Sequence, residues 1–157
     1  MQVLKDFIHN YLLISAIVSW LVAQICKVFT GIFHERQFSI ISLLTGTGGM
    51  PSSHAACGTA LAVSSGMCYG LASAPFAISA ILAMVVMRDA SGVRREAGKQ
   101  AQVLNRIIQE MFTTNDEEKF HADLKELLGH TPLQVFVGAL LGAAVAFALW
   151  PAFSGIV

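Results

Sequence analysis

The sequence predicts an all-α protein embedded in a membrane: a bundle of about four transmembrane helices, with one or two amphipathic helices on its cytoplasmic side. Its 157 residues are 55% hydrophobic and only 13% charged, with a mean hydropathy of +0.63. A soluble domain usually has about a quarter charged residues. Long apolar runs, amphipathic segments and one-sided basic residues all support this fold class. The length indicates one domain over residues 1–157.

The first apolar run extends over residues 11–33. It has the roughly 20 mainly apolar residues that a helix needs to cross a bilayer. Lys27 lies near its far end, where a long basic side chain can reach the head groups. The run is too long for the apolar region of a signal peptide, and no clear cleavage site follows it. We therefore expect a span that is retained.

The apolar region over residues 55–87 is too long for one span. Gly70 and residues 72–75 offer a break, because Pro75 favours a helix start and disfavours a helix interior. We predict a second span over residues 53–71 and a third from residue 75 to 87 that continues as a polar helix.

The last span is predicted over residues 133–150 and ends before Pro151. Small residues recur at every fourth position on the second and last spans, namely Gly58, Ala62, Gly66 and Gly70, and Gly138, Gly142 and Ala146. This spacing lets helix backbones approach closely in lipid. Packing within one chain is favoured, and a homo-oligomer through these faces is the alternative.

Between the third and last spans the chain is amphipathic. One helical face gathers the apolar residues Val93, Ala97, Ala101, Leu104, Ile108 and Met111. Residues 113–119 are predicted to form a loop, and residues 120–128 a short amphipathic helix that ends at Gly129.

Four spans place both termini on one side and residues 34–51 and 88–131 on the other. These two ranges contain eight of the ten Lys and Arg residues. Lys27 lies at the same end of the first span, and only Lys5 lies with the termini. The positive-inside rule predicts that the second side faces the cytoplasm. Zero net charge gives no indication of nucleic-acid binding. The cysteines, Cys26, Cys57 and Cys68, are interpreted as buried apolar side chains, since their spacing fits neither a metal nor a redox site.

Residues 46–54, GTGGMPSSH, form a glycine-rich loop that leads into a helix N-terminus. Free backbone N–H groups and the helix dipole make such a terminus a natural anion site, and Ser52 or Ser53 can cap the helix. A plain capped turn would explain the glycines and serines by themselves. It does not explain His54, because an imidazole in an apolar span costs desolvation unless it has a partner.

Two further motifs follow on the same side. Arg94 and Arg95 can bind phosphate oxygens bidentately, and Asp89 could orient one of them. A basic patch flanking the membrane explains these arginines equally well. Glu126 precedes His130 by four residues, so its carboxylate could fix the imidazole tautomer. The alternative is a helix end followed by an incidental histidine.

Together these residues indicate chemistry at phosphorus. One histidine could attack phosphorus while a carboxylate orients it, and the other could protonate the leaving alkoxide. Cations and backbone N–H groups would stabilise the five-coordinate phosphorus. Lys27 and Arg36, near the end of the first span, could add positive charge or be simple membrane anchors. No metal or other cofactor is expected.

Three ordered motifs give the chain a family resemblance. Residues 50–54 (MPSSH), 89–95 (DASGVRR) and 129–132 (GHTP) resemble the divergent branch of the type 2 phosphatidic acid phosphatases, which is related to acid phosphatases and vanadium-dependent haloperoxidases. The resemblance implies that Ser52 binds phosphate and that His54 is the general acid. Ser53 stands where better-studied relatives have glycine. Their third motif, in which aspartate follows the nucleophilic histidine, is altered here.

Within that altered motif, His130 is the predicted nucleophile and Glu126 its partner. Lys27 and Arg36 match the family's first motif only in residue type, because their spacing is longer and no proline follows Arg36. The resemblance implies a metal-independent phosphoric monoester hydrolase acting on phosphatidic acid, a related phospholipid or an isoprenoid phosphate. The alternative is a catalytically inactive membrane binding or interaction protein with the same fold.

Overall fold

The computed structural model describes residues 1–32, 49–112 and 130–155, apart from the side chains of a few helical residues in these ranges, including Arg94 and Arg95. The all-α prediction is confirmed, because the described ranges contain helices and turns and no strands. The helices are α1 (Gln2–Ile8), α2 (Tyr11–Ile32), α4 (Ser53–Tyr69), α5 (Ala74–Ser91), α6 (Val93–Phe112) and α7 (Pro132–Phe153). The predicted helix over residues 120–128 lies outside the described residues.

Three segments are long and apolar enough to cross a membrane: Tyr11–Thr30, Ala74–Ile108 and Pro132–Phe153. They coincide with the first, third and last predicted spans. α4 corresponds to the second predicted span and has 17 residues. At 1.5 Å per residue it is about 26 Å long, slightly shorter than a typical hydrocarbon core. A fourth crossing by α4 stays a prediction.

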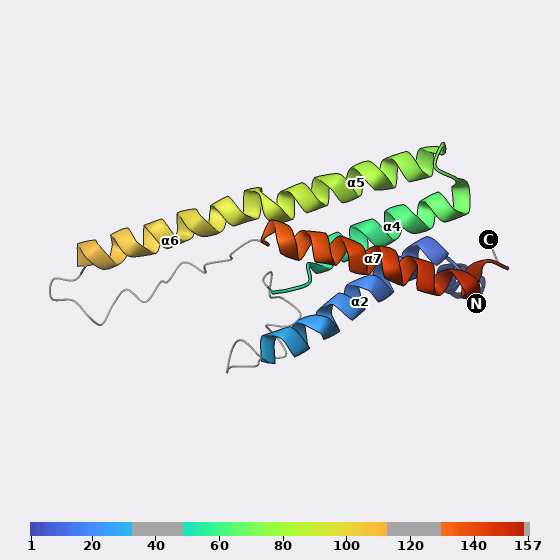
Figure 1. The fold of residues 1–157 in the computed structure, drawn as a ribbon, viewed down its shortest axis with the longest axis horizontal. Helices are drawn as coiled ribbons and strands as arrows, with labels where there is room; N and C mark the ends of the chain where they lie inside the picture. The colour runs from blue at the N-terminus through green and yellow to red at the C-terminus, as the bar shows by residue number, and fades with distance from the viewer. Residues whose placement is uncertain (33–48, 113–129, 156–157) are drawn as a thin grey trace.

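α4 lies at the centre of the bundle and packs against α2, α5 and α7. α2 also packs against α7, whereas α2 and α5 do not contact each other. The N-terminus and the C-terminal end of α7 lie at one end of the bundle, and α6 projects from the other end in line with α5 (Figure 1). The helical hydrogen bonds continue across Gly92, whose N–H donates to the Arg88 carbonyl oxygen at 2.8 Å.

Small residues bring α7 and α4 into backbone contact. A Cβ on Gly138 would overlap the Ser52 carbonyl oxygen, and one on Gly142 would overlap that of Ala56. On the other side of α4, a Cβ on Gly58 would lie 3.2 Å from the Ala83 Cα of α5. The small-residue faces are thus used for packing within the chain, the interpretation that the sequence favoured.

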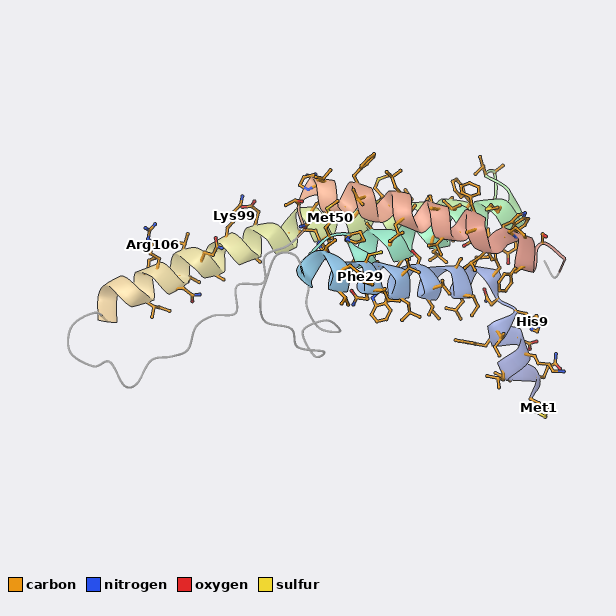
Figure 2. The ribbon with its side chains drawn as sticks, turned by 60° about the horizontal axis from the view of Figure 1, so that its bottom comes forward. Met1, His9, Phe29, Met50, Lys99 and Arg106 are labelled. Carbon is orange, nitrogen blue, oxygen red and sulfur yellow. The ribbon has the colours of Figure 1, made fainter. Side chains whose placement is uncertain are left out.

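The structure corrects two boundaries. Pro151 was predicted to end the last span, but α7 continues through it to Phe153. Proline near the last turn removes only one hydrogen-bond donor, so the helix can continue for a few residues. The sequence analysis also missed α1, a seven-residue helix that bends away from α2 (Figure 2). It is too short for a span, which is why a search for apolar runs overlooked it.

Candidate functional site

The N-terminus of α4 is fixed by its own cap and by α7. Ser52 is the N-cap residue, and its side chain accepts a hydrogen bond from the Ala55 N–H at 3.4 Å. The Ser52 N–H donates to the Gln134 carbonyl oxygen at 3.0 Å. Ser52 is fully buried, so its side chain serves the helix end in this structure. Its proposed contact with phosphate stays a prediction.

The turn before α4 crosses the end of α2. Gly49 has φ +88°, a conformation that glycine adopts without a Cβ penalty. Thr30 donates from its hydroxyl to the Met50 carbonyl oxygen at 2.7 Å. A Cβ on Gly49 would lie 3.7 Å from the Lys27 side chain, so this turn lies directly over the lysine stem. Met50 lies at the end of the bundle from which α6 projects (Figure 2).

Lys27 is buried at this end, with 8% of its surface exposed. Its Nζ donates to the Ser53 Oγ at 3.1 Å. No carboxylate within the described ranges lies at ion-pair distance from Lys27. A buried ammonium group is costly unless a negative charge compensates it. The α2–α4 junction therefore favours an anion.

His130 lies just before α7 with 1% of its surface exposed. Its backbone N–H donates to the Ala90 carbonyl oxygen of α5 at 2.9 Å. Its Nδ1 lies 3.3 Å from the Gln134 Oε1, a long hydrogen bond whose donor depends on the tautomer. Since an amide oxygen only accepts, the contact favours the tautomer with the proton on Nδ1 and a lone pair on Nε2.

Gln134 is a site residue that the sequence analysis missed. Its Oε1 also accepts from the Thr131 N–H at 2.9 Å, and the Thr131 hydroxyl accepts from the Gln134 N–H at 3.3 Å, which completes a capping box. The signal was present in the sequence as Thr131-Pro132-Leu133-Gln134 ahead of an apolar run. The cap fixes the glutamine, and the glutamine in turn contacts the histidine.

The two motif histidines lie together. The ring centroids of His54 and His130 are 6.0 Å apart, and the rings are tilted by 59°. His54 occupies the first turn of α4, one residue after the Ser53 that contacts Lys27. Three helix ends therefore place a cation, a hydroxyl and two imidazoles at one end of the bundle.

The sequence matches the model of the Divergent PAP2 family over residues 8–145. The chain belongs to this family. It is also 40% identical to the "Uncharacterized membrane protein YuiD" of Bacillus subtilis (strain 168) over 153 residues, which cover 92% of this chain and 96% of that protein. No solved structure matches the chain significantly.

Membership of the Divergent PAP2 family confirms the resemblance seen in the three motifs. The chain is thus a membrane protein with a phosphatase-like sequence, and its apolar helices agree with this. Neither match identifies a substrate, a reaction or a functional residue.

Five of the predicted site residues have no described contact in the site. Arg36 and Glu126 lie outside the described residues. Arg94 and Arg95 belong to the first turn of α6, but their side chains are not described. Asp89 is partly buried in the last turn of α5, next to the Ala90 that contacts His130. Their roles stay predictions.

Proposed function

We propose that this member of the Divergent PAP2 family removes the phosphate group from a membrane lipid phosphate through a histidine nucleophile. The observation on which the proposal depends is the 6.0 Å separation of the His54 and His130 rings, one residue along α4 from the Ser53 that the buried Lys27 contacts. These residues come from three helices that are distant in sequence. A lysine, a serine and two histidines form a chemically complete set for phosphoryl transfer without a metal ion.

Phosphate binding is assigned to Lys27, Ser53 and the N-terminus of α4. The Lys27 Nζ already donates to the Ser53 hydroxyl, so both can turn their remaining hydrogen-bonding capacity to the same anion. The positive end of the α4 dipole adds to the attraction. Arg94 and Arg95 are further phosphate ligands in the proposal, and Arg36 is another.

The reaction assigns complementary roles to the histidines. The His130 Nε2 lone pair attacks phosphorus, the bond from phosphorus to the lipid oxygen breaks, and His54 donates a proton to the leaving alkoxide. Water then attacks the phosphohistidine, the P–N bond breaks, and His54 takes a proton from the water. Gln134 holds the His130 tautomer, the part that the sequence assigned to Glu126.

The separation of the rings sets a geometric requirement. A reacting nitrogen lies about 3–3.5 Å from phosphorus before attack, and a proton donor about 2.6–3.2 Å from its acceptor. The two nitrogens must then be more than about 6 Å apart. The ring centroids are 6.0 Å apart, so the distance between the reacting nitrogens depends on how the two rings are turned. Rotation of the partly buried His54 ring would adjust this distance, whereas His130 is held by its contacts with α5 and Gln134.

A lipid substrate agrees with the position of the site. The site lies at the end of a bundle of apolar helices, where the head groups of a bilayer meet water. Phosphatidic acid, a related phosphoglycerolipid and an isoprenoid phosphate all present a phosphate monoester or its equivalent at that depth. The choice among these substrates is a matter for assay.

The burial of His130 favours a second candidate function. A nucleophile with 1% of its surface exposed must become accessible before it can react. A chain that binds a lipid phosphate through Lys27 and Ser53, without hydrolysing it, would leave His130 as a structural contact between α5 and α7. This is the inactive membrane binding protein that the sequence analysis kept as its alternative.

The two functions are separated by phosphate release from purified protein in vesicles that contain phosphatidic acid or an isoprenoid phosphate. We expect release by the wild type and a loss of at least about 10²-fold in His54→Ala and in His130→Ala. The His9→Ala variant is the matched control, because His9 is exposed at the opposite end of the bundle from the site (Figure 2). Binding of both lipids without turnover would support the alternative and exclude hydrolysis of these substrates.

The basic residues support a cytoplasmic orientation for this site. Lys99 is exposed on α6 and lies at the same end of the bundle as the site. A Lys99→Cys variant should resist a membrane-impermeant maleimide in intact cells and react after the cells are opened. Labelling in intact cells would place the site on the opposite face of the membrane.

A further inference from the structure

One side of α4 has no neighbouring helix. α2 and α5 both pack against α4, but they do not contact each other. The Ser53 hydroxyl contacts Lys27 on α2, and Gly58 faces Ala83 on α5. At about 100° per residue these two positions differ by about 140° around the α4 axis, which leaves room for a strip of side chains between them.

The residues of this strip follow from the helical repeat. His54, Cys57, Leu61 and Cys68 are separated by three, four and seven positions, so they share one face. That face lies between the directions of Ser53 and Gly58. All four side chains are partly buried, in contrast to fully buried Ala56 on the α7 side. We call these four residues the α4 strip.

The α4 strip joins the proposed phosphate site to the lipid core. His54 at its start faces His130, and the later members of the strip are apolar, flanked by the fully buried Ser64 and Ser65. From His54 to Cys68 the helix rises by about 21 Å, and to Leu61 by about 10 Å. Half of a hydrocarbon core is about 15 Å thick. The strip is therefore long enough to follow a lipid chain through one leaflet.

We propose that the α4 strip, between α2 and α5, binds the hydrocarbon chain of the lipid whose phosphate lies between His54 and His130. The inference rests on the proposed function. An amphiphile has its chain attached to its phosphate, and the strip begins at the anion site and continues at lipid depth. Because α2 and α5 do not meet, the chain can enter sideways from the bilayer without leaving it.

The first test fills the strip with a larger side chain. Leu61→Trp should raise KM for a long-chain lipid phosphate by about 5- to 20-fold and leave hydrolysis of a short-chain, water-soluble phosphate monoester unchanged. The control is Leu140→Trp, the same substitution on the exposed face of α7, which points away from α4. Equal loss for both substrates, or equal effects of both variants, would overturn the inference while the phosphatase function stands.

The second test does not require turnover. The full-length protein in vesicles is irradiated with phosphatidic acid that carries a diazirine in its acyl chain, and labelled peptides are mapped. We expect labelling of residues 57–68 that unlabelled phosphatidic acid competes away and phosphatidylcholine does not. Labelling that is spread evenly over the exposed faces of α2, α5 and α7, or that is insensitive to competition, would refute binding of the hydrocarbon chain at the α4 strip. Labelling that unlabelled phosphatidic acid competes away, in a protein that releases no phosphate, would support chain binding at the α4 strip and refute the phosphatase function.

Discussion

The Gly138→Ala substitution tests whether the α4–α7 contact positions the site. The new Cβ would overlap the Ser52 carbonyl oxygen and lie 3.1 Å from both the Ser52 carbonyl carbon and the Ala55 Cβ. These neighbours belong to the backbone and first turn of α4, so they cannot move as a flexible side chain would. The two helices must separate, and the 3.0 Å hydrogen bond from Ser52 to Gln134 must lengthen.

The magnitude follows from three contributions. Overpacking costs about 1–3 kcal/mol. Loss of the backbone hydrogen bond costs about 0.5–1.5 kcal/mol. Replacing glycine by alanine inside a helix raises the free energy of unfolding by up to about 1 kcal/mol, because alanine has the higher helix propensity. The free energy of unfolding should therefore fall by roughly 0.5–4.5 kcal/mol. Phosphate release should fall with it, because the α4 N-terminus bears Ser53 and His54.

Thermal unfolding of the purified protein in detergent measures this change, followed by a thiol-reactive dye that reports exposure of the three partly buried cysteines. Each kcal/mol should lower the melting temperature by about 2–4 °C. Gly155→Ala is the control, because a Cβ at that position meets nothing within 4 Å. If both variants melt at the same temperature, the close approach of α4 and α7 does not stabilise the fold as described.

Substitutions at three further residues separate stability from chemistry. Lys27→Met should leave the melting temperature unchanged or raise it, since apolar replacement of a buried charge is often neutral or stabilising. The same substitution should weaken binding of a lipid phosphate, as measured by vesicle sedimentation. Gln134→Leu should lower the free energy of unfolding by about 1 kcal/mol through loss of the capping box and should reduce phosphate release. Gln134→Glu, which keeps the cap, should restore stability. Tyr11→Phe removes the 2.6 Å hydrogen bond to the Ala146 carbonyl oxygen at the far end of the bundle. We expect the free energy of unfolding to fall by about 0.5–1.5 kcal/mol with unchanged kcat/KM. A reduced kcat/KM would contradict a purely structural role for Tyr11.

The candidate site could be predicted from the sequence only as a set of residue types on one side of the membrane. His54 and His130 each adjoin an apolar run. Two predicted spans separate them along the chain, so the sequence predicts that both lie at the same end. Their 6.0 Å separation was not predictable, because it depends on how far α4 and α7 rotate about their own axes. Glycines at 138 and 142 set that rotation by admitting the α4 backbone.

Gln134 shows how a local motif was overlooked. Glu126 was preferred as the partner of His130 because a carboxylate is the stronger acceptor and the i to i+4 spacing suits a helix. The glutamine has the same spacing on the other side of His130, inside the next helix. A capping box fixes its side chain at a helix start, where a contact with the preceding residue is geometrically natural.

The sequence by itself determined that the chain lies in a membrane, where its long helices run and which motifs share an end, because the length of an apolar run limits where a chain can cross lipid. Only the tertiary structure decided that Lys27 meets Ser53, that α4 is the central helix and that one of its faces has no helical neighbour. These features arise from fitting several helices around shared backbone contacts at once. No single segment contains that information, since the direction of each side chain depends on the packing of all its neighbours.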